Sequence, residues 1–156
     1  MNEVLLEARE ELKRLEHIIY VSLKYTRTTD VLINALTRLI SVFDLIIESF
    51  LEDAKEKNLM NALPKSPAFR GTKLAELYPD DQDLQNYLAF YIFLKNVLKS
   101  SYKKREEYRR HVTVIVELDH STVEVDIDCL TNYEKYVRKF LMHGYRKIEG
   151  VKEEDE

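Results

Sequence analysis

A long and almost entirely apolar segment places the strongest constraint on the fold. Between residues 28 and 57, apolar side chains recur at steps of three and four, and they also fill neighbouring positions around the helix. These residues are Val31, Leu32, Ala35, Leu36, Leu39, Ile40, Phe43, Ile46, Ile47, Phe50 and Leu51. A helix that is apolar around most of its circumference must be covered on most sides, so we expect a central helix surrounded by others.

Four further segments predict helices that can cover the central one. Residues 3 to 25 carry an apolar stripe opposite a charged face, and residues 132 to 143 carry apolar side chains at helical spacing. Ser66 followed by Pro67 is typical of a helix start, which predicts a short helix ending near Tyr78. One of the aspartates between residues 80 and 83 can cap a further helix, which we expect to continue to about Tyr108.

From residue 112 the period changes to strict alternation, which predicts a β-hairpin. The apolar members are Val112, Val114, Val116 and Leu118 in one strand, and Val123, Val125 and Ile127 in the other. A two-residue turn at His120 and Ser121 puts all of them on one face. The same register puts Glu117 opposite Glu124 on the outer face, where like charges repel. We expect this face either to be solvated or to be covered by a cation of the last helix, a partner subunit or a metal.

These patterns together predict a mainly α-helical single domain, with about five helices and one β-hairpin before the last helix. A chain of 156 residues is large enough to form one domain with a buried core. Only three glycines and three prolines are present, which favours long elements with few turns. The predicted domain spans residues 1–148, and the acidic composition of residues 149–156 predicts a flexible tail.

Composition narrows the classes of function and location. The net charge of −4 argues against a globally basic nucleic-acid-binding protein but allows a local basic patch. The single cysteine, Cys129, excludes an internal disulfide. The start lacks a signal-peptide pattern and no apolar run approaches the roughly 18 residues of a membrane span, so we expect a cytoplasmic protein without membrane contact. Charged residues at 33%, with few glutamines, favour a thermophilic source.

Residues 102–111 combine cations with two tyrosines and predict a contact with RNA. Five cations against two glutamates give a local charge of +3, from Lys103, Lys104, Arg105, Arg109 and Arg110 against Glu106 and Glu107. Arginine forks bind phosphates and aromatic rings stack on unpaired bases, so we assign RNA binding to Arg105, Arg109 and His111. The alternative is structural, since cations in the last turn of the predicted helix stabilise its negative end and Glu106 can pair with Arg110.

A polar stripe on the predicted central helix is the second candidate site. Thr37, Ser41, Asp44 and Glu48 follow one another at steps of four, three and four. Asp44 and Glu48 can supply oxygen ligands of the kind that Mg²⁺ prefers, and a bound Mg²⁺ can activate water for phosphodiester hydrolysis. We therefore predict a metal-binding and catalytic role for Asp44 and Glu48. The alternative is a face that is solvated or paired with lysine and arginine.

Two sequence resemblances bear on function. The segments LKYTRTTDVLINALTRLISVFDLIIESFLE and REEYRRHVTVIVEL, followed by VEVDID, resemble a small archaeal family that is grouped by fold with the RNase III catalytic domain. That resemblance implies an RNase III-like homodimer that cleaves RNA with acidic residues and Mg²⁺. Asp44 matches the aspartate of the RNase III motif, while Phe43 stands where the motif has glycine. Arg105 and His111 also resemble the Arg–His pair of the HEPN ribonucleases.

These observations lead to two expectations about function. The first is an RNA-interacting protein, with a Mg²⁺-dependent endoribonuclease as its enzymatic form. The second is a non-catalytic helical module that dimerises and binds a protein partner. No phosphate-binding loop or dinucleotide fingerprint occurs, so we expect no nucleotide cofactor, and the scattered histidines predict no zinc site.

Overall fold

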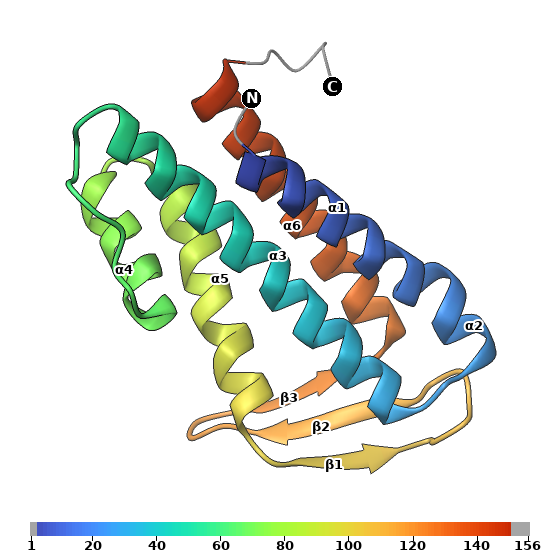
Figure 1. The fold of residues 1–156 in the computed structure, drawn as a ribbon. Helices are drawn as coiled ribbons and strands as arrows, with labels where there is room; N and C mark the ends of the chain where they lie inside the picture. The colour runs from blue at the N-terminus through green and yellow to red at the C-terminus, as the bar shows by residue number, and fades with distance from the viewer. Residues whose placement is uncertain (1–2, 151–156) are drawn as a thin grey trace.

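Helix α3, Thr29–Glu56, lies at the centre of the molecule, as its apolar circumference predicts. In the computed structural model, which describes residues 3–150, helices α1 and α6 lie on one side of it and helices α4 and α5 on the other (Figure 1). Thr28 caps its start by accepting a hydrogen bond from the N–H of Val31 at 3.3 Å. The prediction of a mainly helical chain with a central helix is confirmed.

The elements follow one another in the order expected for five helical segments with strands before the last. The first segment is continuous and comprises α1 (Glu3–His17), the π-helical turn η1 (Ile18–Ser22) and α2 (Leu23–Tyr25). It is followed by α3, α4 (Pro67–Leu77) and α5 (Gln82–Lys99). The strands are β1 (Tyr102–Arg105), β2 (Thr113–Glu117) and β3 (Thr122–Val125), and the chain then forms α6 (Ile127–Glu149).

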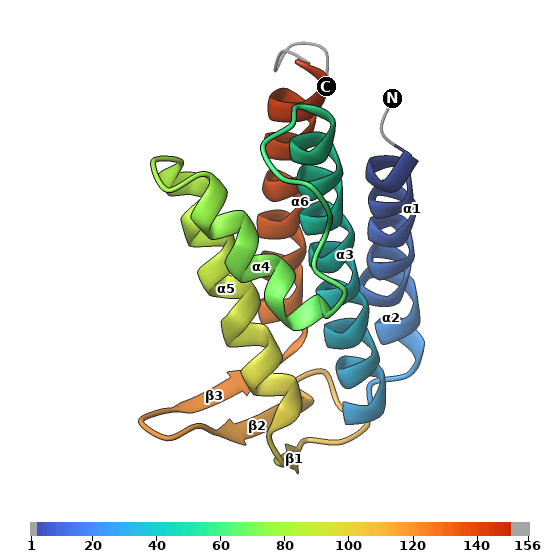
Figure 2. The same cartoon turned by 60° about the vertical axis from the view of Figure 1, so that its left-hand side comes forward.

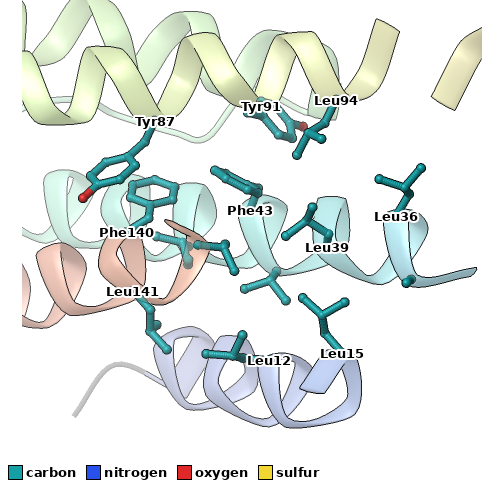
Figure 3. Packing of buried hydrophobic residues seen from close by; sticks show 14 of the residues in the cluster. Leu12, Leu15, Leu36, Leu39, Phe43, Tyr87, Tyr91, Leu94, Phe140 and Leu141 are labelled. Carbon is teal, nitrogen blue, oxygen red and sulfur yellow. The ribbon is translucent and has the colours of Figure 1, made fainter. Parts of the chain in front are cut away.

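Aromatic rings from three helices form the middle of the core (Figure 3). Phe43 of α3 lies 5.4 Å from Phe140 of α6, measured between ring centroids, and Tyr87 of α5 stacks on Phe140 at 4.7 Å. Leu12 and Leu15 of α1 fill the opposite side of α3. The three helix interfaces therefore share one continuous apolar cluster.

The β-sheet has three strands and not the predicted two. The chain leaves helix α5 at Ser100, whose backbone is extended, and Tyr102–Arg105 then pairs antiparallel with β2. The prediction that the helix continues to Tyr108 is therefore wrong. Pairing with β1 satisfies one edge of β2, which would otherwise expose unpaired N–H and C=O groups. The sheet closes one end of the helical bundle (Figures 1 and 2).

The register of the hairpin differs from the prediction by two residues. Val116 faces Val123 and Val114 faces Val125, so the valines do share the inner face. The turn lies one residue earlier than predicted, at Asp119 and His120, since the N–H of Leu118 donates to Ser121 O at 2.8 Å. Glu117 consequently faces Thr122, and the predicted opposition of Glu117 and Glu124 is wrong.

The cation beside Glu124 comes from the strand that the sequence did not predict. Glu124 forms an ion pair with Arg105 of β1. The last helix supplies no such cover, because Arg138 instead pairs with Glu16 at 3.0 Å and with the buried Glu134 at 2.6 Å.

Helix α6 is longer than predicted at both ends. Asp126 caps it by accepting from the N–H of Cys129 at 2.8 Å, so Ile127 begins a helix and does not continue a strand. The helix ends at Glu149, before Gly150, whose φ of 72° is the left-handed conformation that favours glycine at a helix end. Residues 151–156 of the predicted acidic tail lie outside the described residues.

Candidate nucleic-acid interface

The loop between β1 and β2, residues 106–112, is fixed to the corner where α2 leads into α3 (Figure 1). The N–H of Tyr108 donates to Arg27 O at 2.7 Å, and the N–H of Thr29 donates to Glu107 Oε1 at 2.6 Å. Hydrogen bonding from Thr29 lowers the pKa of Glu107, so this carboxylate stays charged at the positive end of helix α3. The loop is therefore attached at two successive residues.

Two residues of this loop adopt a backbone conformation that is uncommon outside glycine. Glu106 has a φ of 57° and Tyr108 a φ of 68°. Such conformations cost free energy and persist where surrounding contacts hold them in place. Here the two hydrogen bonds to the α2–α3 corner provide those contacts, and the Tyr108 side chain is left 78% exposed.

Beside the loop lies a hollow of about 210 Å³ at the N-terminus of α6. One wall consists of the cations Lys24, Arg27 and Arg110 together with His111. Its acidic wall consists of Asp126, which is engaged in capping α6, and of the exposed Asp128. The hollow thus presents three permanent cations from two segments that are far apart in sequence.

Arg27 is the cation that points most directly to a ligand. Its Nε is buried and has no hydrogen-bond partner within residues 3–150. A buried guanidinium nitrogen without an acceptor is unfavourable, and an anion in the hollow beside it would supply that acceptor.

Two tyrosines on the outside of the same corner are almost fully exposed. Tyr25 is 84% exposed at the end of α2, and Tyr108 projects from the loop that is bonded to Arg27. Tyrosine is enriched at binding surfaces, because its ring is apolar and its hydroxyl can remain in water. We call the set formed by Lys24, Tyr25, Arg27, Tyr108, Arg110 and His111 the junction surface.

The predicted RNA-binding residues separate into different environments. His111 lines the hollow of the junction surface. Arg109 is exposed in the same loop, where its N–H donates to Glu106 O at 3.0 Å. Arg105 lies on β1 and pairs with Glu124, so it lies on a strand and not on the predicted helix, apart from His111 in the loop.

Several residues of the junction surface were not predicted. Arg110 was assigned to a helical pair with Glu106, which the strand and loop do not form. Lys24, Tyr25 and Arg27 belong to the short stretch KYTR, where α2 ends and the connection to α3 begins. This cluster of cations and an aromatic residue was the signal that the sequence offered.

Asp44 and Glu48, the predicted metal ligands, each have a protein partner. Tyr91 donates its hydroxyl to Asp44, and Arg70 pairs with Glu48 at 3.0 Å. Burial raises the pKa of Asp44, although the hydrogen bond from Tyr91 and the charge of Lys95 act in the opposite direction. Glu48 matches the alternative of an arginine-paired face. Within residues 3–150, no three His, Cys, Asp or Glu side chains are grouped so that they could hold a metal.

A buried histidine–aspartate pair lies at the opposite end of helix α5. His143 Nε2 is 2.8 Å from Asp81 Oδ2, and Asp81 also caps α5 by accepting from the N–H of Leu84 at 3.1 Å. Burial alone would raise the pKa of Asp81, but the hydrogen bonds from His143 and Leu84 together lower it. The two residues are far apart in sequence, so no local pattern could predict their contact.

Comparisons with known proteins give no information on the function of the chain. No helix among the described residues is long and apolar enough to cross a membrane. No family model, no curated protein and no solved structure matches the chain. The resemblances to the RNase III and HEPN families, the homodimer and the Mg²⁺ site therefore stay predictions.

Proposed function

We propose that the protein binds single-stranded RNA through the junction surface. The observation that carries the proposal is the buried, unpartnered Nε of Arg27 in a hollow lined by Lys24 and Arg110, with Tyr25 and Tyr108 exposed at the same corner. Phosphate recognition and base stacking need these two kinds of side chain together.

The arginines and the lysine would bind the backbone of the RNA. A phosphate in the hollow would accept hydrogen bonds from Arg27, and Arg110 and Lys24 would each bind a neighbouring phosphate of the strand. A phosphate group is small enough to enter a hollow of about 210 Å³, while the sugar and base remain outside.

The tyrosines favour an unpaired strand over a duplex. The faces of bases are hidden by their neighbours in a double helix, but they are available in a single strand. Tyr25 and Tyr108 are exposed enough to stack on such bases, and stacking on an aromatic ring is tolerant of base identity. We therefore expect limited sequence preference.

Two of the acidic residues nearby serve the fold, while Asp128 is exposed in the wall of the hollow. Glu107 accepts from Thr29 at the start of α3, and Asp126 caps α6. Their negative charge lies next to helix N-termini, whose positive ends offset part of it. The overall charge of −4 would then restrict RNA to this corner of the molecule.

Fluorescence anisotropy with a labelled single-stranded oligouridylate tests the proposal. Arg110→Glu should raise the dissociation constant about tenfold or more, since it removes one phosphate contact and adds a repulsion. Tyr108→Ala should also raise the dissociation constant about tenfold, because stacking on one base contributes roughly 1–3 kcal/mol.

Control variants distinguish the loss of contacts at the junction surface from an effect of net charge. Lys55→Glu changes an exposed lysine in the last turn of α3, at the end of that helix remote from Thr29, and should leave binding almost unchanged. Equal affinities for wild type, Arg110→Glu and Tyr108→Ala, with folding confirmed by circular dichroism, would contradict the proposal.

A further inference from the structure

Residues of α4 and α5 line a groove of about 420 Å³. These two helices lie on the side of α3 away from α1 (Figure 2). Helix α4 contributes only small side chains to the floor and walls, among them Ala68, Gly71 and Ala75. Helix α5 contributes Leu88 and Ile92, and Ile92 is 56% exposed. The groove exists because the residues of α4 that line it are too small to fill the space in front of α5.

Charge is distributed unevenly along the groove. Lys95 and Lys99, one turn apart on α5, line the end nearest the sheet, and the part of the chain that the structure describes places no Asp or Glu in the lining. Lys95 Nζ lies 5.0 Å from the centre of the Tyr91 ring. At the other end, the amide of Gln85 is engaged, because it donates to Ala75 O at 3.1 Å and to Tyr78 O at 2.9 Å. The groove is therefore apolar along its length and cationic at one end.

Acidic groups lie close to both lysines but outside the groove. Asp44 lies on the far side of Tyr91, whose hydroxyl it accepts. A neighbouring hollow that shares Lys99 is lined by Glu117 and Asp119. Both lysines therefore have acidic neighbours outside the groove, while no Asp or Glu of residues 3–150 lies beside them in its lining.

The length of the groove and the position of its lysines indicate what kind of occupant fits. Gln85 and Lys99 mark the two ends and are fourteen residues apart on one helix, so the groove is about 21 Å long at 1.5 Å per residue. An elongated apolar molecule with a negative charge at one end matches a lining that is mostly apolar and has its cations at one end.

We propose that this groove binds an unbranched aliphatic carboxylate, independently of the RNA proposal. The chain would lie between the small residues of α4 and the apolar side chains of α5, where burial of each methylene is favourable. The carboxylate would lie at Lys95 and Lys99, which supply ammonium donors without displacing an existing ion pair of the lining.

Titration of the ¹⁵N-labelled full chain with decanoate, followed by two-dimensional NMR, tests the assignment. We expect saturable shifts for amides of residues 68–75 and 85–99. The variant Ala89→Trp places a large ring in the groove from an exposed position, and it should abolish those shifts. Ala62→Trp, at an exposed position outside the groove, is the matched control and should bind decanoate as the wild type does.

The charged end is tested separately. The double variant Lys95→Gln/Lys99→Gln should raise the dissociation constant for decanoate about fivefold to tenfold, because two partly exposed ion pairs are lost. Lys55→Gln, an exposed lysine far from the groove, controls for net charge. Absence of saturable shifts, or equal binding by Ala89→Trp, would overturn the site, and decan-1-ol binding as tightly as decanoate would overturn the assignment of a carboxylate.

Discussion

The salt dependence of RNA binding gives a quantitative test of the junction surface. Lys24, Arg27 and Arg110 are its three permanent cations, and each one that neutralises a phosphate of a single strand contributes about −0.7 to the slope of log K against log salt. The wild-type slope should therefore be about −2.1. Between 50 and 200 mM salt, that slope corresponds to a loss of affinity of about 18-fold.

Removing one cation should change the slope by a defined step. Arg110→Ala should reduce its magnitude from about 2.1 to about 1.4, because one phosphate contact is lost. Arg105→Ala is the matched control: Arg105 already pairs with Glu124 on the outer face of the sheet, so its removal should leave the slope unchanged. Fluorescence anisotropy over a series of salt concentrations measures all three slopes.

Two results would refute this reasoning. A wild-type slope near zero would show that phosphates are not bound by the three cations. A slope that falls in Arg105→Ala but not in Arg110→Ala would place the RNA on the sheet and not at the α2–α3 corner.

Three further predictions concern stability and metal chemistry. Asp81→Ala should lower the free energy of unfolding by about 2–3 kcal/mol in urea titrations, since it removes a helix cap and leaves the buried His143 without its partner. The control Asp83→Ala should lower it by less than about 1 kcal/mol. Because the pKa of Asp81 is lowered from its usual 3.8, the contribution of its carboxylate to the free energy of unfolding is present above that pH and is lost as the pH falls below it. Asp81→Asn should flatten this part of the stability–pH curve, and an unchanged curve would contradict the assignment. RNA incubated with the protein and Mg²⁺ should remain intact, because Asp44 accepts a hydrogen bond from Tyr91 and Glu48 forms an ion pair with Arg70. Cleavage that is lost in Asp44→Asn would show instead that these carboxylates hold a catalytic metal.

The helices could be predicted because their signals are local. The steps of three and four from Val31 to Leu51 correspond to buried positions of α3, and Thr28, Pro67 and Asp81 stand where helix starts require them. Each of these signals depends on residues within a few positions of one another, so the surrounding fold could not change it.

The stretch from Tyr102 to His111 could not be predicted in the same way. Its charged residues are compatible with a helix or with an edge strand, and the choice is made by β2, which offers a free edge for pairing. The left-handed conformations of Glu106 and Tyr108 depend on contacts with Arg27 and Thr29, about 80 positions earlier in the chain. The position of Arg110 in the hollow follows from those contacts.

The candidate sites, too, could be predicted only where the signal was local. Asp44 and Glu48 were found from their spacing, but their partners Tyr91 and Arg70 come from α5 and α4, and only the packing of helices reveals them. His111 was selected for its neighbours on a predicted helix, and it lines the hollow for a different reason, the turn that follows β1.

The positions of the start of α1 and the end of α6 have a practical consequence for handling the protein. Helix α1 begins, and helix α6 ends, at the end of the bundle opposite the sheet (Figure 1). The junction surface lies at the sheet end, separated by the length of α3, which at 28 residues is about 42 Å. A fluorophore, an affinity tag or a sensor surface can therefore be attached at either terminus without covering the α2–α3 corner, and immobilised protein should bind ligands there as freely as protein in solution.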